Sequence, residues 1–135
     1  MFFRTRAKYN ARRINCGGHM FDSMLECSYY NYLLGLKKAG IVKFIELQPK
    51  FLLLPAFDKN GVHYRAIYYK ADFRVTYFNK DKTPRSKRNE KEYVEIVDVK
   101  GFQTQVFKIK RKLFEYKYPN LSLKIINGKE MRDKW

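Results

Sequence analysis

Apolar positions recur at helical spacing in two segments of the chain. The first begins at an expected cap, Asp22 or Ser23, and ends before Gly40, a residue that favours helix termination. Its buried stripe is expected to consist of Leu25, Tyr29, Tyr32 and Leu36. The second segment runs from the cap candidate Thr104 to Tyr118, where a proline follows. Its apolar stripe is expected to consist of Val106, Ile109, Leu113 and Tyr116, widened by Phe107 and Phe114.

The remaining apolar segments have the pattern of strands. Residues 41–57 are strand-like, with prolines that confine them to sheet edges or strand ends. The turn signal Asp58-Lys59-Asn60-Gly61 predicts a hairpin. Residues 64–78 are too many for one ordinary strand, so we expect a bend near Lys70 or Ala71. A polar loop follows at 79–91, and further strands are expected at 93–99 and 121–126.

This order of elements predicts an α/β domain with a mixed central sheet flanked by helices. We divide the chain into a basic N-terminal arm at 1–21, a folded domain at 22–126 and a C-terminal tail at 127–135. The arm is expected to be mobile and to become ordered on a nucleic acid, or to be a solvated tail with no role.

The charge balance indicates the kind of partner. The 135 residues include 29 Lys and Arg against 13 Asp and Glu, a net charge of +16. Such an excess favours a polyanion, most simply nucleic acid. No apolar run approaches the ~20 residues needed to span a bilayer, so no membrane partner is expected. Cys16 and Cys27 are too few for a disulfide framework, which makes a reducing cytoplasm the expected compartment.

Two aspartates inside apolar strands point to a chemical role. Asp98 and Lys100 are two residues apart in a strand, so their side chains share one face. Asp72 lies in another strand-like run, and charges in such places are costly unless they are paired or bind a metal. The three residues therefore predict a site for Mg²⁺, or Mn²⁺ in its place, that hydrolyses phosphodiesters. The carbonyl of Val99 is a further expected ligand.

A structural reading of the same residues stays open. Asp98 and Lys100 would then form only an ion pair, and Asp72 would bond to a basic neighbour, Lys70 or Arg74.

Glu26 has two possible roles. Ser23 and Glu26 match a capping box, which would make the glutamate structural. Glu26 also lies at the edge of the expected buried stripe, from which it could complete the acid cluster.

The order of these residues resembles that of the PD-(D/E)XK nuclease superfamily. An acid in the first helix, an aspartate in one strand and Asp-x-Lys in the next correspond to Glu26, Asp72, Asp98 and Lys100, and Ala71 stands where the superfamily name has proline. The resemblance implies a restriction-endonuclease-like core. It also implies catalytic roles for these four residues and metal binding by the three acids.

Most of the chain is similar to a small phage protein family related to Holliday-junction resolvases. The similarity is carried by Lys8-Tyr9-Asn10-Ala11, Phe21-Asp22-Ser23-x-Leu25-Glu26, Leu47-Gln48-Pro49-Lys50-Phe51, Tyr69-Lys70-Ala71-Asp72-Phe73, Asp98-Val99-Lys100-Gly101, Phe107-Lys108-x-Lys110 and Tyr118-Pro119. It implies a role in trimming branched DNA before packaging or during recombination, so we expect a Mg²⁺-dependent endonuclease that cuts four-way DNA junctions in the cytoplasm, that of the host cell if phage-encoded. A homodimer is expected, because two symmetric nicks need two active sites and a chain of this size holds only one. The alternatives are a non-catalytic basic nucleic-acid-binding protein, and a transposon-end or restriction-type endonuclease of the same superfamily.

Basic residues in the arm, in the loop between the acid-bearing strands and on the second helix are expected to contact DNA phosphates. The candidates are Lys8, Arg12, Arg13, Lys70, Lys82, Arg85, Lys87, Arg88, Lys108 and Lys112.

Overall fold

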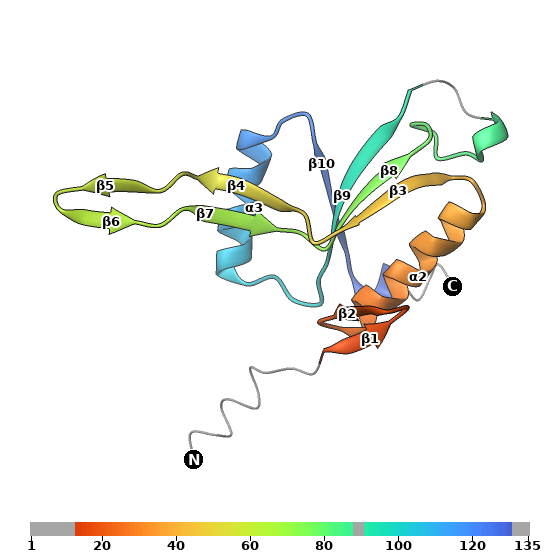
Figure 1. Ribbon diagram of the computed structural model, residues 1–135, viewed down its shortest axis with the longest axis horizontal. Helices are drawn as coiled ribbons and strands as arrows, with labels where there is room; N and C mark the ends of the chain where they lie inside the picture. Colours follow the sequence, from red (N-terminus) through yellow and green to blue (C-terminus); the bar gives the residue numbers. More distant parts are fainter. Residues whose placement is uncertain (1–12, 88–90, 131–135) are drawn as a thin grey trace, which may run out of the picture.

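The computed structural model describes residues 13–87 and 91–130 of the chain. Its regular elements are β1 (Ile14–Cys16), β2 (His19–Phe21), α2 (Met24–Lys38), β3 (Val42–Leu47), β4 (Lys50–Leu54), β5 (Phe57–Lys59), β6 (Val62–Tyr64), β7 (Ile67–Lys70), β8 (Phe73–Tyr77), a 3-10 helix (Arg85–Lys87), β9 (Tyr93–Val99), α3 (Gln105–Lys117) and β10 (Ser122–Ile126). The central sheet has the strand order β10-β9-β8-β3 (Figure 1). Strands β9 and β10 are parallel and the other neighbours antiparallel, so the predicted mixed α/β fold is confirmed.

Helix α2 has the predicted ends. The Ser23 hydroxyl caps it by accepting a hydrogen bond from the Glu26 N–H at 3.1 Å, and Ala39 is the C-cap. The buried face differs from the expected stripe. Tyr30 and Leu33 are buried, whereas the expected residues Leu25, Tyr32 and Leu36 are only partly buried. The reason is that α2 packs between the sheet and a second layer formed by β1 and β2.

The β1–β2 hairpin was not expected from the sequence. Its turn is made by Gly17 and Gly18, whose φ angles of 61° and 87° suit glycine. Residues 14–21 therefore belong to the folded body, and an arm extending to residue 21 is too long. Residues 1–12 lie outside the described residues. Strands of three residues are too short to show a period of two, which is why the pattern missed them.

A disulfide joins Cys16 of this hairpin to Cys27 of α2. The hairpin brings the two Cα atoms to 5.8 Å, within the range that a disulfide spans. The sequence predicted too few cysteines for a disulfide framework, but a single cross-link between neighbouring elements needs no such framework. The cysteine count therefore does not support a reducing compartment.

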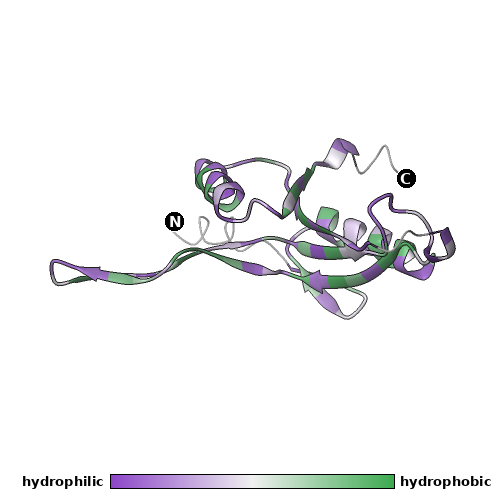
Figure 2. Cartoon of the chain, turned by 90° about the horizontal axis from the view of Figure 1, so that it is seen from above, coloured by the Kyte–Doolittle hydropathy of each residue, from purple (hydrophilic) through white to green (hydrophobic). Residues whose placement is uncertain are grey.

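Strands β4 to β7 form a two-stranded ribbon, residues 50–70, that leaves the end of the central sheet (Figure 1). Its tip is the predicted Asn60-Gly61 turn, with φ angles of 51° and 76°. The predicted bend is also confirmed, because β7 ends at Lys70 and β8 begins at Phe73. Figure 2 shows the ribbon extending from the body, with α3 over its base.

Helix α3 has the predicted cap, Thr104, but not the predicted buried stripe. Phe107 and Phe114 are buried against Tyr69 of the ribbon, whereas Val106 is 62% exposed and Tyr116 is 88% exposed. The helix rests on a ribbon of only two strands, which can cover a narrow line of its surface. The wider apolar stripe is therefore left at the surface.

Strand β9 lies between two apolar clusters. Val97 and Val99 face the α2 side, whereas Ile96 packs with Phe51 and Phe114 on the α3 side. Residues 95–99 are consequently all buried, and a charged side chain on this strand is held by the surrounding structure. No helix within residues 13–87 and 91–130 is long and apolar enough to cross a membrane.

Candidate functional site

The fold brings the two predicted aspartates together at the end of the central sheet. The β8–β9 register pairs Phe73 with Val97, and one further step places Asp72 opposite Asp98. The Asp72 N–H donates to the Val97 carbonyl at 3.0 Å, which continues the pairing to this point. Both carboxyl groups lie on the face opposite Phe73, because side chains alternate along each strand.

Each carboxyl group has a defined partner. The backbone N–H of Val99 donates to Oδ2 of Asp72 at 2.7 Å. Asp98 is only 2% exposed, and Nζ of Lys100 lies 3.4 Å from its Oδ1. The Lys100 ammonium also lies 4.6 Å from the centre of the Phe107 ring, a cation–π contact. The predicted shared face of Asp98 and Lys100 is confirmed. The backbone group of Val99 that contacts the acid pair is its N–H.

The pair of acids is electrostatically unfavourable without a cation. Burial, followed by the charge of Asp98, raises the pKa of Asp72 to about 8, and the Val99 N–H opposes this rise. At neutral pH one proton is therefore held between carboxyl groups that would ordinarily both be ionised. A divalent cation that prefers oxygen ligands would displace this proton and relieve the repulsion.

We expect cation binding to be linked to the ionisation of Asp72. The folded-state pKa of Asp72, about 8, lies above the ordinary value of 3.8. The contribution of Asp72 to the stability of the metal-free fold is therefore fully present below pH 4, and it is lost as pH rises through 8. Affinity for Ca²⁺ should rise by about tenfold per pH unit up to pH 8, because one proton is released. Calorimetric titration from pH 6 to 9 measures this. A pH-independent affinity would contradict it, and Asp72→Asn should bind Ca²⁺ weakly at every pH.

Tyr69 is a site residue that the sequence did not reveal. Its hydroxyl donates a hydrogen bond to Oδ2 of Asp98, and its buried ring packs against Phe107 and Phe114. Burial and the charge of Asp98 raise its pKa, so it stays a donor. Tyr69 and Asp72 are three residues apart, a spacing that would put them on opposite faces of a regular strand. Only the bend at 71–72 brings both to the Asp98 carboxyl group.

Glu26 reaches this region from the first turn of α2. The Ser23 hydroxyl lies 3.5 Å from its Oε1. Burial raises the pKa of Glu26, as do the charges of Asp22 and Asp98, and a hydrogen bond from the backbone of Asp22 opposes this rise. Within the described part of the chain, no three acidic, histidine or cysteine side chains are grouped to hold a metal. The contacts of Glu26 with Ser23 and with the backbone of Asp22 favour the cap role.

Glu26→Gln separates the two roles, because glutamine keeps the hydrogen-bond acceptor and loses the charge. We expect the variant to fold and to cut DNA within about tenfold of the wild-type rate, since its influence on the aspartates is electrostatic only. Single-turnover cleavage with Mg²⁺ tests this. Complete loss of cutting in a folded variant would instead make Glu26 a metal ligand.

Among the basic candidates in the loop, Lys82 has a structural partner. Its Nζ lies 3.1 Å from Oε2 of Glu95, a second buried acid on β9, and 4.8 Å from the Tyr77 ring. A phosphate would have to compete with this ion pair. Arg85 lies over the Phe78 ring at 4.8 Å and remains exposed.

The other described candidates are at the surface. Arg13 lies 3.5 Å from Asp22, and the exposed residues Lys70, Lys87, Lys108 and Lys112 are spread over β7, the 3-10 helix and α3. Lys8, Arg12 and Arg88 lie outside the described residues.

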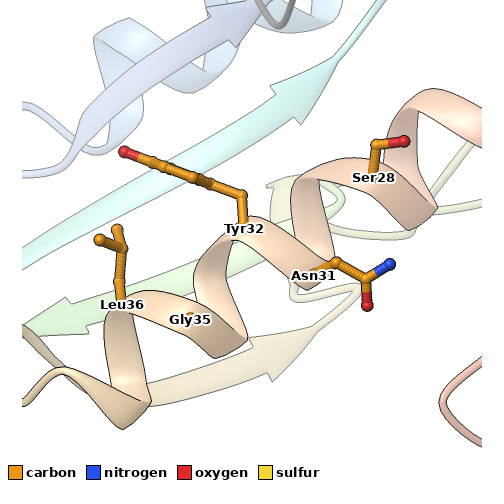
Figure 3. Close-up of a pocket in the computed structure, with 5 residues that line it drawn as sticks. All are labelled: Ser28, Asn31, Tyr32, Gly35 and Leu36. Atoms are coloured by element: carbon orange, nitrogen blue, oxygen red, sulfur yellow. The ribbon is translucent and has the colours of Figure 1, made fainter. Parts of the chain in front are cut away.

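A separate hollow of about 490 Å³ lies on α2 (Figure 3). The described residues that line it are Ser28, Asn31, Tyr32, Gly35 and Leu36. None of these residues is an acid, a lysine or a histidine, and none belongs to the acid pair.

The fold and the site define a mixed α/β protein with paired aspartates and a lysine at the end of its sheet. The chain belongs to a family described as Protein of unknown function (DUF1064), which it matches over residues 6–132. This match covers the β1–β2 hairpin as well as the domain expected at 22–126. Comparison with curated proteins and with solved structures gave no match.

Proposed function

We propose that this protein is a Mg²⁺-dependent endonuclease that cuts branched DNA, with a core of the PD-(D/E)XK type. One observation carries the proposal: Asp72 and Asp98 are packed side by side with Lys100 at the end of the sheet, so that burial and repulsion hold a proton on the pair. The net charge of +16 supports a polyanionic substrate.

Asp72 and Asp98 would hold Mg²⁺, or Mn²⁺ in its place, together with the Val99 carbonyl. When bound, the cation would lower the pKa of a water and neutralise charge on the phosphate. Lys100 would orient the attacking water and face the charge that develops on phosphorus. The Val99 N–H and the Tyr69 hydroxyl would hold the two carboxylates in place, which limits reorganisation during the reaction.

The four-way junction is the favoured substrate and a homodimer the favoured form. Two opposed nicks need two active sites, and the proposed site, with Asp72 opposite Asp98, is supplied once by each chain. The cytoplasm, that of the host cell if the protein is phage-encoded, stays the proposed compartment.

A specific contact favours the rival function, a non-catalytic nucleic-acid-binding protein. Lys100 and Asp98 are already an ion pair, as a purely structural role would require. Asp72 does not fit a purely structural role as the partner of a basic side chain. Its carboxyl group accepts a hydrogen bond from the Val99 N–H, and its pKa is raised. An acid stabilised only by a basic neighbour would have a lowered pKa.

A cleavage assay with end-labelled DNA distinguishes these functions. A four-way junction and a linear duplex of the same arms are incubated with Mg²⁺ or with EDTA. We expect paired nicks near the branch point with Mg²⁺ and none with EDTA. An uncut junction in both Mg²⁺ and Mn²⁺ would overturn the proposal and leave the binding protein. Cutting at one linear sequence would indicate a transposon-end or restriction-type enzyme.

A further inference from the structure

A groove of about 240 Å³ lies between the ribbon and the start of α3. The ribbon contributes Tyr68 and Lys70, the β9–α3 connection contributes Lys100 and Thr104, and α3 contributes Val106 and Lys110. We propose that this groove, here called the strand groove, holds the backbone of one DNA strand beside the phosphate that is cut. The inference rests on the proposed function, because it extends the same site.

The strand groove is continuous with the acid pair. Lys100 lines the groove and also lies 3.4 Å from Asp98. Tyr69 lines it too, and its hydroxyl donates to the same carboxyl group. A strand lying in the groove would therefore lie against two residues that touch the Asp98 carboxyl group, and the phosphates next to the cut would meet the groove's cations.

The groove has the charge that a polyanion requires. Lys70, Lys100 and Lys110 come from three different segments, and no carboxylate occurs among its described lining residues. The Thr104 oxygen accepts from the Phe107 N–H at 3.1 Å, which leaves the hydroxyl hydrogen as a donor. The N-terminal turn of α3 adds a favourable field for negative charge.

The same groove has an apolar side, which favours a nucleic-acid strand over a small free anion. Val106 and Tyr68 are exposed, and Phe107 lies beneath them. Proteins that hold single strands combine cations for the phosphates with aromatic and apolar surfaces for sugars and bases. A volume below the roughly 300–1,000 Å³ of small-molecule pockets also fits one strand better than a whole metabolite.

Lys110 is the lysine of α3 that lines the groove, whereas the sequence candidates Lys108 and Lys112 are not among its described lining residues. Lys117 provides a matched control. It follows Lys110 by seven residues on the same helix, so it points in nearly the same direction about 10 Å further along the axis. Lys117 is exposed and is outside the groove, so Lys117→Ala removes the same charge without touching the proposed contact.

The experiment measures binding of the full chain to a four-way junction in EDTA, with methylphosphonate placed at one phosphate at a time. We expect Lys70→Ala and Lys110→Ala to weaken binding about 5–10-fold and to lower the salt slope by about 0.7–0.9 each. One neutral phosphate near the branch should weaken wild-type binding by the same factor and cause no further loss in Lys110→Ala. Lys117→Ala should stay sensitive to that phosphate.

Two outcomes would overturn the inference: Lys117→Ala matching Lys110→Ala in every measurement, or every neutral phosphate weakening Lys110→Ala as much as wild type. The nuclease proposal is tested separately by cutting with Mg²⁺. If the wild-type protein cuts DNA but Lys110→Ala stays sensitive to every neutral phosphate, the nuclease proposal stands and the groove proposal is wrong. If Lys110→Ala loses its sensitivity to one phosphate but the wild-type protein does not cut, the groove proposal stands and the nuclease proposal is wrong.

Discussion

Asp98→Asn should abolish Mg²⁺-dependent cleavage of a four-way junction while leaving binding to the same junction unchanged or tighter. The substitution removes one of two adjacent carboxylates, and with it the oxygen charge that a hard divalent cation needs. A bound metal contributes several kcal/mol to stabilising such a reaction, so we expect a loss on the order of 10³-fold. Binding should not weaken, because the change also removes repulsion between the site and phosphate. Asp72→Asn should behave in the same way.

Glu95→Gln is the matched control for this experiment. Glu95 is also a buried acid on β9, but it lies on the opposite face, where it contacts Lys82 at 3.1 Å and Tyr77. The chemical change and the strand are the same, so any general cost of altering β9 appears in both variants. We expect Glu95→Gln to keep cutting, with thermal unfolding and junction binding in EDTA measured for both. Wild-type cutting by Asp98→Asn would show that the site is wrongly assigned.

Local signals in the sequence were sufficient to predict where helices begin and where strands turn. The caps, the Asn60-Gly61 turn and the bend depend on residues close in the chain. Thr104 and the turn are where they were predicted, Ser23 is one of the two predicted caps, and the bend at 71–72 lies next to the predicted position. The buried faces depend on distant partners instead. The hairpin that covers Tyr30, and the narrow ribbon under α3, cannot be read from the period of either helix.

The candidate site divides in the same way. Asp98 and Lys100 share a face because strands alternate, and the bend before Phe73 starts a new strand that places Asp72 opposite Asp98. Tyr69 and the strand groove arise where the ribbon, the sheet end and α3 meet, so no local pattern predicts them. The partner of Lys82 is likewise a residue thirteen positions away in the chain. The sequence therefore predicted the charged residues of the site, but not the contacts that Tyr69 makes with Asp98 and Lys82 makes with Glu95.

Lys100→Ala should slow cleavage by roughly 10²–10⁴-fold, the loss that follows removal of a proton-transfer or charge-stabilising group. Binding to a four-way junction should fall only a few-fold, because the other cations of the strand groove remain. Single-turnover rates at saturating protein measure the first effect, and equilibrium binding in EDTA measures the second. Lys110→Ala is the comparison, since it should affect binding and leave the rate at saturation nearly unchanged.

The same substitution also tests the structural reading of the ion pair. Asp98 is almost fully buried, so losing the Lys100 charge leaves it without its cation and should lower the melting temperature. If Lys100 only balances that charge, the double variant Asp98→Asn with Lys100→Met should regain stability, and neither residue should matter for cutting. If Lys100 acts on the phosphate, the double variant folds and stays inactive. Equal losses of binding and of saturated rate in Lys100→Ala would make this lysine an ordinary phosphate contact.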